Sequence, residues 1–262
     1  MEQNDLGMAE SINWASEDGE DIQGWLYRAE PNQQRAILYI HGGPTAHSEN
    51  KMNPQIQYYL QRGFNVLDVN YRGSTGFGLR FRELIKEDGW GGREQIDISY
   101  GAKKLIAMGL AEHGRVGVTG TSYGGYSAWC QITHTHPDTI GASAPICGMT
   151  DLVVDYETTR PDLRPYSEEM IGGTPAEIPE KYYERSPINF VQNIKGKLLI
   201  IQGGKDPNVT PENVTEVREK LDAHSIPYEI KIFDDEGHGI IRPANQKVLY
   251  ALIADFFDEA FE

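Results

Sequence analysis

The stretch GTSYGGY at residues 120–126 places Ser122 in a Gly-x-Ser-x-Gly pattern. The preceding RVGVT (115–119) has the apolar character of a strand, and the following YSAWCQITHT (126–135) has the pattern of a helix. A serine in such a strand-to-helix turn projects its hydroxyl at the end of the sheet, and small neighbours are needed because bulky ones would clash in so tight a bend. Ser122 is therefore a candidate nucleophile, provided that its partners occur downstream.

Two partners follow in the order expected for such a turn. His238, in DDEGHGI, follows the last apolar run and has a glycine on each side, so it is the candidate base that accepts the serine proton. An imidazole needs a carboxylate to fix its tautomer, and Asp206, in IIQGGKDPNVTP, follows another apolar run. Asp234 and Asp235 are rivals for this role, but they are too close along the chain to reach the far ring nitrogen of His238.

The developing oxyanion of a tetrahedral intermediate needs hydrogen-bond donors. One candidate is the backbone N–H of Tyr123, directly after the nucleophile, and the other is an N–H of the glycine turn in IHGGPTAHS (40–48), for which we favour Gly43. A phosphate-binding glycine loop is the alternative interpretation of this turn, but the lysine that follows such a loop is missing.

Short apolar runs recur along the chain and alternate with helical patterns, after an N-terminal pair of alternating segments that predicts an antiparallel hairpin. The runs are RAILYI, FNVLDVN, RVGVT, IGASAPI, KLLIIQ and YEIKIF. We therefore predict a single α/β domain over 1–262, with about eight strands in one mostly parallel sheet and helices on both faces. The segment 151–195 is rich in Tyr, Pro and Glu and is expected to form short cap-like helices over the site.

The composition excludes several classes of protein. The net charge of −15 disfavours nucleic acid and anionic membranes as partners, and no apolar run has the length of a membrane span. No signal peptide is visible, and Cys130 and Cys147 lie in apolar surroundings, so we expect a cytoplasmic protein with free thiols. His134 and His136 have no evident third ligand and are interpreted as part of a helix end, so we expect neither a metal nor a cofactor.

The chain resembles the catalytic domain of the prolyl oligopeptidase family of serine peptidases, nearest its acylaminoacyl-peptidase and dipeptidyl-aminopeptidase-like branch. The resemblance covers nearly the whole chain and is carried by HGGP (41–44), DVNYRGSTGFG (68–78), GTSYGGY (120–126), ERSPINF (184–190), GGKDPNVTP (203–211) and EGHGI (236–240). It implies an α/β-hydrolase fold with Ser122 as nucleophile, Asp206 as orienting carboxylate and His238 as base. It also implies an oxyanion hole from the amides of Gly43 and Tyr123.

Family peptidases usually carry a β-propeller over the site, and no part of this sequence is expected to form one. Acidic residues that would hold a substrate amine from that side are missing as well. We therefore expect a carboxylesterase acting on small acyl esters, with a peptidase acting on acylated or free N-terminal residues of short peptides as the alternative. A non-catalytic binding protein on the same fold is a second alternative. Val153, Val154 and Tyr156 are the candidate lining of the acyl pocket.

Overall fold

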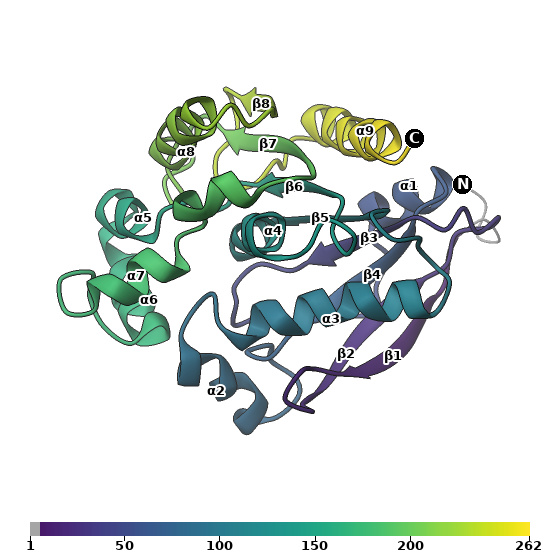
Figure 1. The fold of residues 1–262 in the computed structure, drawn as a ribbon, viewed down its shortest axis with the longest axis horizontal. Helices are drawn as coiled ribbons and strands as arrows, with labels where there is room; N and C mark the ends of the chain where they lie inside the picture. The colour runs from purple at the N-terminus through teal and green to yellow at the C-terminus, as the bar shows by residue number, and fades with distance from the viewer. Residues whose placement is uncertain (1–5) are drawn as a thin grey trace.

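The computed structural model describes residues 6–262, which form a central sheet covered by helices on both faces (Figure 1). Within these residues the sheet has eight strands in the order β1-β2-β4-β3-β5-β6-β7-β8. Their bounds are β1 Ala9–Ala15, β2 Asp21–Tyr27, β3 Ala36–Ile40, β4 Asn65–Asn70, β5 Val116–Thr121, β6 Ala142–Ile146, β7 Lys197–Gly203 and β8 Glu229–Phe233.

The strand directions confirm the predicted topology. β1 pairs antiparallel with β2, and β2 pairs antiparallel with β4, whereas every later pairing is parallel. The central strands are buried on both faces, which explains their continuous apolar runs. Because β3 and β5 are neighbours with Ile40 opposite Gly120, the loops that follow these two strands lie beside each other.

Helices cover the two faces of the sheet and bury separate apolar clusters. On one face lie α3 (Arg93–Ala107), α4 (Tyr123–His134) and α8 (Glu212–Ala223), and on the other lie α1 (Pro54–Gln61) and α9 (Pro243–Ala260) (Figure 1). The expected covering of both faces is therefore confirmed.

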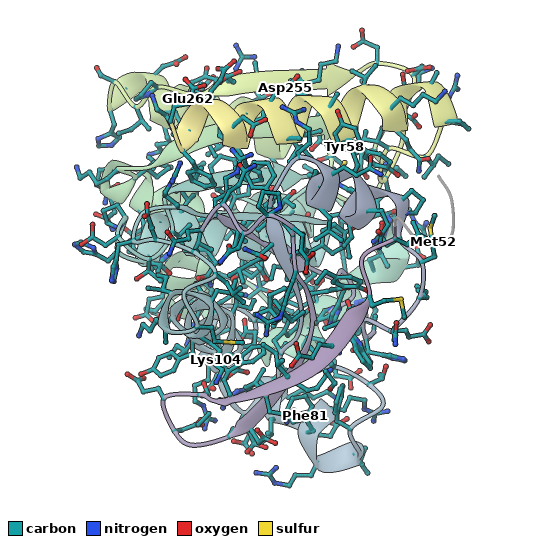
Figure 2. The ribbon with its side chains drawn as sticks, turned by 90° about the vertical axis from the view of Figure 1, so that its right-hand side faces the viewer. Met52, Tyr58, Phe81, Lys104, Asp255 and Glu262 are labelled. Atoms are coloured by element: carbon teal, nitrogen blue, oxygen red, sulfur yellow. The ribbon has the colours of Figure 1, made fainter. Side chains whose placement is uncertain are left out.

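The C-terminal helix α9 is tied to α1 by an ion pair at the surface. Figure 2 labels Asp255 on α9 and Tyr58 on α1 on the same side of the molecule. Arg62 joins them, since its guanidinium donates to Asp255 over 2.7 Å and to Tyr58 Oη over 3.4 Å. A second carboxylate of α9, Asp258, also pairs with Arg62.

The segment 151–195 consists of short helices. They are α5 (Leu152–Thr158), η2 (Pro161–Leu163), α6 (Arg164–Ile171), α7 (Pro179–Arg185) and η3 (Pro187–Asn193). A further helix, α2 (Leu79–Asp88), contacts α6. Proline at the start of four of these helices suits the first helical turn, where no N–H donor is needed.

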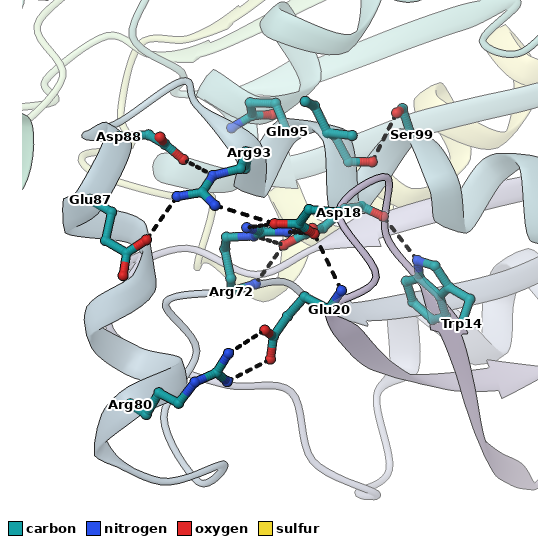
Figure 3. A network of polar contacts seen from close by, with 12 residues as sticks. Trp14, Asp18, Glu20, Arg72, Arg80, Glu87, Asp88, Arg93, Gln95 and Ser99 are labelled. Carbon is teal, nitrogen blue, oxygen red and sulfur yellow. Dashed lines mark hydrogen bonds and ion pairs between the residues drawn. The ribbon is translucent and has the colours of Figure 1, made fainter.

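A buried arginine fixes the loop between β4 and α2 (Figure 3). The Arg72 side chain is fully buried and donates to both carboxylate oxygens of Asp97 on α3, over 2.8 and 2.7 Å. Nη1 and Nη2 of the same guanidinium donate to the carboxylate of Asp18 in the β1–β2 turn, over 2.8 and 2.9 Å. One guanidinium therefore joins three segments that are distant in sequence.

Candidate active site

Ser122 occupies the turn between β5 and α4 in a conformation that few residues adopt. Its φ of 63° and ψ of −120° make it one of the few non-glycine residues with positive φ in residues 6–262. The turn requires glycine at neighbouring positions, because a Cβ at Gly120 or Gly124 would lie 2.3 or 2.1 Å from the carbonyl oxygen of Ile40. The backbone of β3 thus approaches the turn too closely for any larger residue, which is the physical basis of the Gly-x-Ser-x-Gly pattern.

The three residues expected to form a triad lie in one hydrogen-bonded chain. His238 Nε2 is 2.8 Å from Ser122 Oγ, and His238 Nδ1 is 2.8 Å from Asp206 Oδ2. Asp206 follows β7 and His238 follows β8, so both reach Ser122 from the carboxyl ends of parallel strands. Each residue is thus placed by the loop that the sequence had assigned to it.

The Asp206 carboxylate is held firmly behind His238. Its side chain is fully buried, and Oδ1 accepts hydrogen bonds from the backbone N–H groups of Asn208 (2.8 Å) and Val209 (3.1 Å). The rivals Asp234 and Asp235 make no such contact with His238 anywhere in the described residues, and Asp235 pairs with Arg242 at 2.9 Å.

The glycine loop after β3 borders the space beside Ser122 and His238. Gly43 lines it with φ of 125°, a backbone conformation that favours glycine. His41 anchors this loop, because its Nε2 lies 2.9 Å from Ser74 Oγ and its ring stacks on Tyr71 at 4.4 Å between centroids. Burial lowers the pKa of His41 to about 4, so the imidazole stays neutral while it holds the loop.

Tyr123 begins α4, where the N–H groups of the first turn have no acceptor within the helix. Its phenol donates to Glu94 Oε1 over 2.9 Å, and the same oxygen accepts the N–H of Gly92 over 3.1 Å. Burial raises the pKa of Glu94 to about 7. Sequence reasoning missed this carboxyl, because its partners lie in separate segments. Glu94 links the start of α4 to the loop that carries Trp90, whose ring meets that of Tyr123 edge-on at 5.3 Å.

A pocket of about 190 Å³ opens beside Ser122. Its lining consists of Gly43, Trp90, Ser122, Tyr123, Met149, Asp155, Thr159, Leu163, Tyr166, Ser167, Asn208, Val209 and His238. A larger hollow of about 380 Å³ beside α3 and α4 is lined by none of Ser122, Asp206 and His238. The smaller pocket is therefore the candidate substrate pocket.

The pocket lining differs from the expectation for α5. Val153, Val154 and Tyr156 are absent from it, whereas Asp155 and Thr159 are present. The reason is helical geometry, because residues four apart share one face of a helix and their neighbours point elsewhere. Tyr156, for example, points to α6, where its hydroxyl donates to Glu168 over 2.5 Å.

Residues 6–262 contain neither a cluster of metal-ligating side chains nor a helix suited to a membrane. There is no group of three or more His, Cys, Asp or Glu side chains that suits a metal ion. None of the helices in this range combines the length and the apolar character needed to cross a membrane.

The sheet order, the turn at Ser122 and the side chains at the strand ends define the α/β-hydrolase fold. The model of the prolyl oligopeptidase family matches residues 50–262, and the chain belongs to that family. The resemblance noted in the sequence is thereby confirmed.

The relatives are peptidases by name. Dipeptidyl aminopeptidase BIII of Pseudoxanthomonas mexicana is 33% identical over 224 residues, which are 84% of this chain and 32% of that enzyme. The uncharacterized peptidase YtmA of Bacillus subtilis is 30% identical over 90% of this chain and 88% of its own length. The structure of a puromycin-hydrolyzing peptidase of Mycobacterium tuberculosis superposes with a TM-score of 0.93 at 26% identity, over 99% of this chain and 40% of that one. This chain thus spans about a third of the Pseudoxanthomonas enzyme and most of the Bacillus protein.

Proposed function

We propose that the protein is a serine peptidase that cleaves amide bonds of short peptides through an acyl-enzyme. The observation that carries the proposal is the hydrogen-bonded chain from Ser122 Oγ through His238 to Asp206, with 2.8 Å at each step. Such a chain can activate a serine hydroxyl that is a poor nucleophile by itself.

In the proposed reaction His238 Nε2 accepts the proton of Ser122 as Oγ bonds to the substrate carbonyl carbon. The N–H groups of Gly43 and Tyr123 donate to the oxyanion that forms, a contribution typically worth ~10²–10³ in rate for one donor. The protonated imidazole then donates its proton to the leaving nitrogen as the carbon–nitrogen bond breaks. Water, activated by the same imidazole, releases the acyl group and restores Ser122.

Amide cleavage is favoured over the ester cleavage expected from the sequence. The relatives described above are named as peptidases, and none of these three names refers to an esterase. An amine leaves only when it is protonated, and His238 is already within 2.8 Å of the attacking oxygen, as this proton transfer requires. The peptidase alternative therefore replaces the carboxylesterase as our main interpretation.

Replacement of the nucleophile tests the proposal. We expect Ser122→Ala to lose hydrolysis of N-acyl aminoacyl nitroanilides and labelling by a small fluorophosphonate, because no other described hydroxyl bonds to His238. Ser99→Ala serves as the control, since Ser99 Oγ bonds only to the carbonyl of Ile96 on α3. Undiminished anilide hydrolysis by a folded Ser122→Ala protein would refute the proposal.

A parallel assay separates the two kinds of hydrolase. The wild-type protein is offered a nitroanilide and a nitrophenyl ester with the same acyl group. A substantial anilide rate supports the peptidase, whereas turnover of the ester alone supports the carboxylesterase.

A further inference from the structure

One acidic side chain in the pocket is left without a partner when the triad is complete. Asp155 lines the pocket from α5 and is only 6% exposed. Its Oδ1 atom has no hydrogen-bond partner among the described residues. An unpaired polar atom at such depth is costly, and each one in a native protein calls for an explanation.

The groups around Asp155 do not compensate its charge. The negative charges of Asp206, beyond the end of β7, and of Asp151, at the start of α5, both raise its pKa, while Asn213 of α8 lowers it. Asn213 Nδ2 is the neighbouring neutral donor, but it makes no hydrogen bond of normal geometry to Asp155 Oδ1. Tyr182 of α7 is the remaining titratable neighbour. The lining of the pocket includes no lysine or arginine from residues 6–262. No cation of the described residues therefore lies against this carboxyl.

The walls of the pocket suit a long side chain with a charged end. Met149, Leu163 and Val209 supply apolar surface, against which the methylene groups of a lysine or arginine pack well. His238 is 23% exposed, whereas Asp155 is 6% exposed, so the reacting groups lie nearer to solvent than the carboxyl. Thr159, the residue that follows α5, also lines the pocket.

We infer that Asp155 is a specificity-determining residue, which binds the ammonium or guanidinium group of a basic side chain on the acyl side of the cleaved bond. The inference rests on the proposed function, because it assigns the substrate class of the Ser122 site. The basic group of such a substrate would give Asp155 Oδ1 a charged hydrogen-bond donor, which a neutral side chain cannot supply.

Proton release accompanies this binding. Burial, followed by the charge of Asp206, raises the pKa of Asp155 to about 8 in the empty pocket. At pH 6 a cationic side chain must therefore displace a proton from Asp155 into solvent, whereas near pH 8 about half of the protein already has the carboxylate form. The preference for a basic over a neutral side chain is thus expected to increase from pH 6 to pH 8. Titration of His238 affects both substrates equally and cancels in their ratio.

The test compares lysine with norleucine, which has a chain of similar length and no charge. We measure kcat/KM for the two N-acetyl nitroanilides, and the rates at which the two matching diphenyl phosphonates label Ser122. The wild-type protein is expected to favour lysine by about 10- to 100-fold at pH 8, and less at pH 6. Asp155→Asn should abolish most of this preference, whereas Glu157→Gln, an exposed change on the same helix, should keep it.

Several results would overturn the inference. They are a wild-type preference for norleucine, a ratio that does not change with pH, or an Asp155→Asn protein that keeps the lysine preference. An Asp155-dependent preference for the free α-amine of norleucine over its acetylated form would also overturn it. The lysine-to-norleucine ratios of the wild-type protein test the inference even if the Asp155→Asn protein fails to fold. Absence of fluorophosphonate labelling of wild-type Ser122 refutes the proposed function itself, whereas labelling without a lysine preference refutes only the role of Asp155.

Discussion

Ser122 combines an unfavourable backbone with a fixed position of its hydroxyl. A non-glycine residue in such a conformation typically costs about 1–3 kcal/mol and persists only when its surroundings hold it. Here the Ser122 N–H donates to the carbonyl of Ile146 over 3.0 Å, and its own carbonyl accepts the N–H of Tyr126 over 2.9 Å. These two hydrogen bonds hold the strained turn in place. Ser122 Oγ is therefore within reach of His238 before any substrate arrives.

The role of Asp206 as the orienting carboxylate can be tested by replacing one of its carboxylate oxygens with an amide nitrogen. Asp206→Asn should lower kcat for the nitroanilide by about 10⁴-fold, because an amide group no longer favours the His238 tautomer that accepts the Ser122 proton. KM should change little, since Asp206 is buried behind His238 and does not line the pocket. Steady-state kinetics measure both quantities, and circular dichroism checks the fold. A loss smaller than about tenfold would contradict the assigned role.

The loop after β4 illustrates how an element is held by one side chain. Arg72 bonds to Asp97 of α3. It also bonds to Asp18 of the β1–β2 turn, which Arg93 of α3 reaches at 3.3 Å (Figure 3). Because Arg72 and Asp97 are both fully buried, loss of either partner leaves an uncompensated charge in the interior.

Arg72→Met should therefore lower the free energy of unfolding by about 3–5 kcal/mol. Arg93→Met is the matched control, because its ion pairs are more exposed and such pairs contribute about 0–1 kcal/mol each. Urea denaturation monitored by fluorescence compares the two variants with the wild type. Equal stabilities of the two variants would contradict this account, and Asp97→Leu in the Arg72→Met background should restore part of the loss.

The sequence predicted the strands and their terminal loops better than the face that each helix presents. Ser122, Asp206 and His238 could be placed because a parallel sheet brings the carboxyl ends of its strands together. The pocket on α5 could not, because the apolar Val153 and Val154 suggested a lining that the rotation of the helix assigns to Asp155 and Thr159. Burial of an acidic group depends on neighbours from other segments. The local sequence pattern does not identify these neighbours, so it could not predict the buried position of Asp155.

Buried carboxyls spread over the whole molecule make its stability depend on pH. Burial raises the pKa of Asp68 and Glu94 to about 7 and is the main cause of the value of about 8 for Asp155. Between pH 5 and 7 the folded protein keeps these protons, whereas the unfolded chain has released them. Raising the pH in this range therefore removes stability. Asp18 acts oppositely, because Arg72 holds the pKa of its carboxyl well below the usual range and its contribution is lost only in acid.

We expect the free energy of unfolding to fall from pH 5 to pH 8. Each carboxyl that is protonated only in the folded state adds a slope of about 1.4 kcal/mol per pH unit. Asp68→Asn should give a shallower profile than the wild type, and the exposed change Glu157→Gln should leave the slope unaltered. Urea titrations at several pH values measure these slopes. Equal slopes for Asp68→Asn and the wild type would show that Asp68 is ionised in the folded protein.

The helix that carries Asp155 is only seven residues long and is fastened at its start. The Asp151 carboxylate caps it by accepting the N–H of Val153, and the N–H of Leu152 donates to Ser186 Oγ over 2.9 Å. The triad residues, by contrast, follow other strands, β5, β7 and β8. Except for Val209, the residues proposed for side-chain recognition therefore lie in a separate stretch of the gene from the residues proposed for the chemistry. Exchange of the segment 149–172 among homologues is a route to new cleavage preferences that leaves the hydrolytic groups untouched, in nature or in the laboratory.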